Sequence, residues 1–136
     1  MKEELLIEAV VDNLDDVNLF VHKFIEQVEV SKRTLMQLDL IVEEIFVNIS
    51  NYAYAPNIGL VKILLNIETT PLAILLTFID SGIPYNPLEK SDPNVHLSID
   101  DRQIGGLGIF ITKNLVNDIS YRFVDGQNVL QLTKSL

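Results

Sequence analysis

One predicted helix carries oxygen and amide side chains at a spacing that could support chemistry. At 100° per residue, Glu44, Asn48 and Asn51 fall within about 60° of one another and form a polar stripe beside the core-facing side of the helix. A carboxylate and an amide at this spacing could share a metal ion or a water molecule. Glu43 points to the solvent side instead. An ordinary amphipathic helix with a polar rim would show the same pattern, so the stripe alone leaves both interpretations open.

Two glycine turns are the other candidates for ligand binding. Asp80 ends an apolar strand and is followed by Ser81 and Gly82, a pattern that also occurs where only a turn is needed. Gly105, Gly106 and Gly108, with Leu107 among them, open a helix. Glycine lets the backbone approach a ligand, and the unpaired N–H groups of a helix start favour an anion. A plain loop hinge would look similar.

Other nucleotide and metal motifs do not fit this sequence. A dinucleotide-binding fingerprint would follow the first strand and continue to a further glycine where Ile111 stands. A phosphate-binding loop of the Walker type would require Gly-Lys-Ser/Thr, which the sequence lacks. His22 and His96 are too isolated for a zinc site, and the chain has no cysteine.

The elements that must position these residues follow from hydrophobic periodicity and turn signals. The sequence predicts strands over 5–11, 60–68, 72–80, 119–124 and 129–133, and helices over 14–28, 31–54 and 109–116. Asp12 and Asn13 are expected to cap the first helix, and residues 125–128 to form the last turn. Residues 81–104 have no sustained period and contain three prolines, so we expect a functional lid there.

This order of elements predicts an α+β fold, a two-layer sandwich with helices on one face of a mixed, mostly antiparallel sheet. A chain of 136 residues with 48% apolar side chains fits one domain over 1–136. The formal charge of −9 opposes binding to nucleic acid, and no apolar run is long enough to span a membrane. With no secretory signal at the N-terminus, we expect a cytoplasmic protein.

Taken together and in order, three segments resemble the N box and the two glycine boxes of the GHKL ATPase superfamily. They run from Glu44 to Tyr54, from Asp80 to Pro87 and from Gly105 to Ile111. Within that superfamily the short chain is similar to the anti-sigma factor serine/threonine kinases. The resemblance extends through the ending from Asn128 to Lys134.

The resemblance implies a site for Mg-ATP. Asn48 would coordinate Mg²⁺, Asp80 would accept a hydrogen bond from the adenine amino group, and residues 105–108 would close on the phosphates. Glu44 matches the position of the catalytic acid or base. Tyr52 stands where these kinases commonly carry a histidine; a phenol could bond a phosphate oxygen but cannot be cationic. Arg102 could supply the missing positive charge, or could simply be a solvated side chain.

The resemblance also implies partners. The substrate would be a STAS-type anti-sigma antagonist, phosphorylated on Ser or Thr, and a sigma factor would be bound in competition with it. A non-catalytic, ATP-dependent binding switch is the alternative, because Tyr52 replaces the usual histidine. A histidine kinase fragment is a third interpretation, which would require a dimerisation helix before Leu5. A homodimer is left open.

Overall fold

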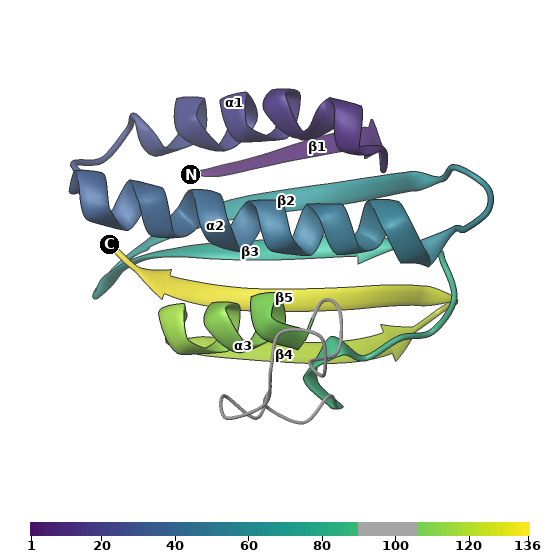
Figure 1. Cartoon of the computed structure of the whole chain (residues 1–136). Coiled ribbons are helices and arrows are strands. Elements are labelled where there is room, and N and C mark those ends of the chain that lie inside the picture. Colours follow the sequence, from purple (N-terminus) through teal and green to yellow (C-terminus); the bar gives the residue numbers. More distant parts are fainter. Residues whose placement is uncertain (90–105) are drawn as a thin grey trace.

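The computed structural model describes residues 1–89 and 106–136, which form an antiparallel sheet covered on one face by helices (Figure 1). The elements are β1 (Lys2–Glu8), α1 (Leu14–Ile25), α2 (Lys32–Asn48), β2 (Leu60–Thr69), β3 (Leu72–Asp80), α3 (Gly106–Leu115), β4 (Asp118–Val124) and β5 (Gln127–Ser135). The predicted α+β two-layer sandwich is confirmed.

The five strands lie in the order β1-β2-β3-β5-β4. All four pairings are antiparallel, whereas the sequence predicted a mixed, mostly antiparallel sheet. The β4–β5 turn is also shorter than the predicted four residues. Asp125 and Gly126 both have positive φ, 54° and 76°, as a two-residue hairpin turn requires.

The first strand lies three residues earlier than predicted. Lys2 already pairs with Asn66 of β2, and the ladder ends at Glu8 opposite Leu60. After this point the Asn13 amide donates to the Glu8 carbonyl at 3.0 Å, and Val11–Asn13 forms a 3-10 turn. The expected cap of α1 is therefore wrong, because the Asn13 side chain closes the preceding turn and makes no capping bond to the helix.

The α2 helix ends earlier than the predicted Tyr54. It begins as expected, because the Ser31 hydroxyl accepts the N–H of Thr34 at 3.0 Å. The α-helical pattern stops at Asn48 and continues as a π-helical turn over Ile49–Ala53. Such wide turns are rare and are found mostly as single turns, often at functional sites.

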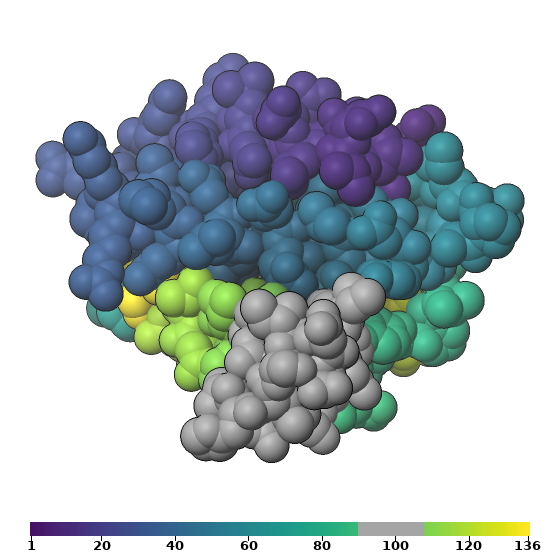
Figure 2. All heavy atoms as spheres, viewed as in Figure 1, coloured from purple at the N-terminus to yellow at the C-terminus, as the bar shows by residue number. Residues whose placement is uncertain are grey.

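The core lies between the helices and one face of the sheet. Every second residue of β2 from Val61 to Ile67 is buried there, and Phe46 of α2 is fully buried against this layer. In Figure 1, α1 covers β1, α2 covers the central strands and α3 covers β5 and β4. Figure 2 shows α1 and α2 as one continuous surface with α3 emerging below it. Among residues 1–89 and 106–136, no helix lies on the opposite face of the sheet.

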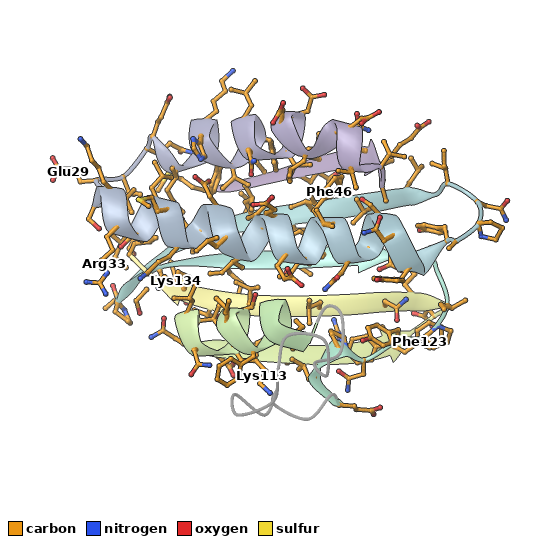
Figure 3. The ribbon with its side chains drawn as sticks, in the orientation of Figure 1. Glu29, Arg33, Phe46, Lys113, Phe123 and Lys134 are labelled. Carbon is orange, nitrogen blue, oxygen red and sulfur yellow. The ribbon has the colours of Figure 1, made fainter. Side chains whose placement is uncertain are left out.

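Lys134 of β5 fixes the C-terminal end of α3. Its Nζ donates to the Leu115 carbonyl and to Gln37 Oε1 of α2, both at 2.7 Å. Burial, and secondarily the charge of Arg33, lower the pKa of Lys134 below its usual value. Figure 3 shows Lys134 and Arg33 at the same end of the helical layer. α3 is thus held at its end, while its first turn faces α2.

No helix in the described ranges is long and apolar enough to cross a membrane.

Candidate functional site

A cavity of about 400 Å³ lies between the end of α2, the strands β3 and β5, and the start of α3. Its size falls within the range of small-molecule sites. Most of the lining surface is apolar. The lining residues are Ile45, Asn48, Ile49, Tyr52, Ala53, Phe78, Asp80, Ile83, Tyr85, Pro87, Ile109, Tyr121, Asn128 and Leu130.

Asp80 is buried at the end of β3, with 6% of its surface exposed. Its Oδ1 accepts two hydrogen bonds, from the Gly82 N–H and from the Asn128 amide, each at 2.9 Å. No described residue donates to Oδ2. The carboxylate lines the cavity, so one oxygen is held by the protein and the other remains an acceptor for a ligand.

Asn128 is the main residue that the sequence interpretation missed. Its Nδ2 donates to Asp80 and to the Ile83 carbonyl at 2.9 Å, and its Oδ1 accepts from the Tyr85 N–H at 3.1 Å and from the Tyr121 hydroxyl. The amide is therefore fully satisfied and orients Asp80. The sequence did contain a sign of this role. Asn128 lies two residues before Leu130 on the same strand, so both side chains face inward, and an amide stands where an apolar core residue is expected.

Gly82 must be a glycine for a packing reason. A Cβ there would overlap the carbonyl group of Ala53, at the end of the π-helical turn. The next residue, Ile83, donates its N–H to the same Ala53 carbonyl at 3.0 Å. The turn after β3 is thus fastened directly to the end of the α2 segment, and the two form adjoining walls of the cavity.

The helix phase predicted for the two neighbouring glutamates agrees with the structure. Glu43 is exposed, whereas Glu44 is half-buried and accepts a hydrogen bond from Asn48 Nδ2 at 3.1 Å. The Glu44 carboxylate also lies against Gly108, where a Cβ would overlap it. α2 and α3 therefore meet at this carboxylate, and Asn48 lines the cavity beside it.

The remaining predicted site residues differ in where they lie. Tyr52 is at the rim of the cavity with 52% of its surface exposed. Asn51 is exposed and is not a lining residue, because the π-helical turn rotates less per residue than an α-helix and moves Asn51 off the stripe.

The start of α3 is only partly described. Gly106 and Leu107 are its first two residues, three positions before the predicted start at Ile109. Arg102, Gly105 and most of the expected lid over 81–104 lie outside the described residues; within 81–89, a 3-10 turn forms at Pro87–Glu89.

Comparison with known proteins agrees with this geometry. The family model of the histidine kinase-like ATPase domain matches residues 7–134. The chain belongs to this family. Membership implies that it binds ATP.

Two similar proteins extend the comparison. The chain is 32% identical over 103 residues to the serine/threonine-protein kinase BtrW of Bordetella bronchiseptica, a match covering 76% of this chain and 72% of that protein. A solved structure of the RsbU and RsbW domains of a Mycobacterium tuberculosis protein superimposes with a TM-score of 0.67 at 14% identity. That match covers 98% of this chain and 32% of the longer one, and it supports the fold.

Replacing Asn128 with Ala should destabilise the nucleotide-free protein by ~1–3 kcal/mol, because Asp80, Ile83, Tyr85 and Tyr121 each lose a partner. Urea unfolding would measure this. Asn66→Ala, on the uncovered face of β2, is the control and should stay within about 0.5 kcal/mol of the wild type. Equal losses for the two variants would contradict the role of Asn128.

Proposed function

We propose that this protein is a Mg-ATP-dependent serine/threonine protein kinase acting as an anti-sigma regulatory factor. The observation that carries the proposal is the pair of polar groups in one cavity: the Asp80 carboxylate with one oxygen left for a ligand, and Asn48 held by Glu44. The kinase activity is supported by the similarity to BtrW. The anti-sigma role is supported by the resemblance of the three motif segments and the short chain to the anti-sigma factor kinases.

The cavity suits the adenine ring. Phe78, Leu130 and Ile109 give it apolar walls, and Asp80 can accept one hydrogen bond from an exocyclic amino group. Because Asp80 Oδ1 already accepts two hydrogen bonds, the carboxylate offers a single free oxygen. This arrangement fits the one amino group of adenine better than the two adjacent donors of guanine.

The side chains that border the cavity also fit a magnesium ion carried by the nucleotide. Glu44 can accept a hydrogen bond only from the Nδ2 end of Asn48, so Asn48 Oδ1 is turned away from Glu44 and can serve as a ligand. Mg²⁺ is commonly held by one or two protein oxygens together with substrate phosphates. Bound Mg²⁺ would offset the charge of the phosphates.

Glu44 is the proposed general base. As the hydroxyl oxygen of a partner Ser or Thr bonds to the γ-phosphorus, the bond from that phosphorus to the β–γ bridging oxygen breaks and ADP leaves. Glu44 accepts the hydroxyl proton. The remaining groups would position the reactants. Asp80 would bind the adenine ring, Asn48 would bind the metal ion, and residues 105–108 would contact the phosphates. Catalysis of this kind is mostly positioning and electrostatics.

The proposed partners follow from the same similarity. A STAS-type anti-sigma antagonist would be the substrate, and a sigma factor would be bound in competition with it. The proposed location is the cytoplasm. For a homodimer, the proposed contact is the uncovered sheet face, where Leu6 and Leu60 are 60% and 49% exposed. Sedimentation equilibrium would test it, and a mass of one chain would exclude the dimer.

A non-catalytic ATP-dependent switch is the second candidate. None of the described residues that line the cavity is basic, and Tyr52 stands at its rim. A protein with this lining could bind ATP and change its affinity for a partner without transferring phosphate. Incubation with Mg-ATP and the STAS-type protein, followed by intact mass, separates the two functions: an added phosphate supports the kinase, and an unchanged mass supports the switch.

The two neighbouring glutamates should respond differently to substitution. Glu44→Ala should keep the fold and still bind nucleotide, but lose phosphotransfer by ~10²–10⁴-fold, because the general base is removed. Glu43→Ala should stay within about threefold of the wild type, as expected of an exposed side chain whose loss has little effect on stability. Initial rates of partner phosphorylation measure both. An inactive Glu43→Ala with an active Glu44→Ala would overturn the assignment.

Asp80→Asn should separate nucleotide binding from folding. The Asn oxygen can still accept the Gly82 and Asn128 N–H groups, so the nucleotide-free protein should melt close to the wild type. Its amide nitrogen would then face the adenine amino group, donor against donor, and ATP affinity should fall ~10–100-fold. Asp118→Asn, at an exposed position of β4, is the matched control. Unchanged ATP affinity in Asp80→Asn would contradict the adenine contact.

A further inference from the structure

The contact of Glu44 with both Asn48 and Gly108 links two helices at the proposed metal end of the site. We propose that Glu44 is a positioning residue for the Asn48 amide, and that Gly108 leaves the space in which the Glu44 carboxylate lies. The first turns of α3 and the orientation of Asn48 are then coupled through one side chain. This inference rests on the proposed function, because it assumes that Asn48 Oδ1 serves the metal.

The orientation of the Asn48 amide is decided by chemistry. An amide side chain has a donor end and an acceptor end of almost the same shape, and rotation by half a turn exchanges them. A carboxylate accepts and cannot donate, so Glu44 selects the orientation in which Nδ2 faces it at 3.1 Å. Oδ1 is left for the cavity that Asn48 lines. Without Glu44, the amide would be free to present its NH₂ group, which cannot bind a cation.

The position of the Glu44 carboxylate is decided in turn by α3. A Cβ on residue 108 would overlap the carboxyl carbon and both carboxyl oxygens of Glu44. The carboxylate therefore lies directly against the α3 backbone, in the space that a side chain would occupy. Gly108 is the third residue of α3, and the neighbouring Ile109 is buried, with 3% of its surface exposed.

The coupling extends to the first turn of α3. Gly106, its first residue, is two positions before Gly108. A shift of this turn toward or away from α2 changes the surface against which Glu44 rests, and so changes the hold of Glu44 on Asn48.

Simple helix packing is the competing explanation for Gly108. In that case residue 108 would be small because α2 and α3 lie close together, and its replacement would have the same cost whatever stands at 44. Under the proposed coupling, the cost of a methyl group at 108 depends on the Glu44 carboxylate. A double-mutant cycle distinguishes these explanations, since only interacting residues give non-additive effects.

The first measurement is the melting temperature of the nucleotide-free protein. Gly108→Ala should lower it, because the methyl group displaces the carboxylate. In the Glu44→Ala background the same substitution should have little cost or raise the melting temperature, because the space is empty and Ala is the better helix former. Equal changes in melting temperature in both backgrounds would overturn the proposal that Gly108 leaves room for the Glu44 carboxylate. This measurement needs no ATP, so it stands even if the proposed function fails.

The second measurement is the gain in ATP affinity on adding Mg²⁺, obtained by calorimetry. Loss of a side chain that orients a metal ligand typically costs ~10–100-fold in metal affinity, so Glu44→Ala and Gly108→Ala should each reduce this gain about tenfold or more. Glu44→Gln should retain most of it, because its amide oxygen still accepts from Asn48 Nδ2, even though the base is gone. Glu43→Gln is the matched control.

The outcomes test the positioning role of Glu44 separately from the proposed Mg-ATP binding. A full Mg²⁺ gain in Glu44→Ala would overturn the positioning role and leave Glu44 as a base alone. A loss in Glu44→Gln equal to that in Glu44→Ala would also overturn it, since the charge and not the acceptor would then matter. Absence of any Mg-ATP binding in the wild type would contradict the proposed function itself.

Discussion

The structure around the cavity depends on the burial of one carboxylate. Asp80 ends β3 with 6% of its surface exposed, and a buried carboxylate must be compensated by hydrogen bonds. The compensation comes from the Gly82 N–H and from Asn128 on the neighbouring strand, in register with Asp80. These two bonds fix the turn after β3 and the start of β5. In the same turn, the Ile83 N–H donates a hydrogen bond to the Ala53 carbonyl at the end of the α2 segment.

On the helical side of the cavity, a second carboxylate is also held by a hydrogen bond and by close packing. Glu44 can remain half-buried because Asn48 donates to it and Gly108 leaves it room. A strand end therefore supplies one acidic group and a helix supplies the other, and both are fixed by neighbours from distant parts of the chain. Asp80 and Asn48 line the cavity, and Glu44 holds Asn48 from outside that lining.

The sequence correctly predicted the features that depend on the regular spacing of residues within one helix or strand. The phase of Glu43, Glu44 and Asn48 was correct because the α-helix is regular as far as residue 48. Asn51 was misplaced because a π-helical turn begins at Ile49, and no residue type in that turn indicates a change of period. The early β1 strand was missed because its first residues are charged, and only their pairing with β2 makes them a strand.

The role of Asn128 could not be predicted from local pattern, because it depends on which residue of β3 lies opposite. That register brings together residues 48 positions apart in the chain. Gly82 and Gly108 were identified as glycine turns for ligand approach, and Arg102 and Gly105 lie outside the described residues. The structure adds that Gly82 and Gly108 also have immediate protein neighbours, Ala53 and Glu44.

Titration of the purified protein with ATP, with and without Mg²⁺ and alongside GTP, tests the central claim most directly. The account predicts saturable binding of Mg-ATP, weaker binding without the metal, and much weaker binding of GTP. At a hundred times Kd, Mg-ATP should add ~2.7 kcal/mol to the free energy of unfolding. No binding at millimolar Mg-ATP would contradict the proposal that the cavity binds Mg-ATP through Asp80 and Asn48. Equal affinity for Mg-GTP would contradict the proposed contact between Asp80 and adenine.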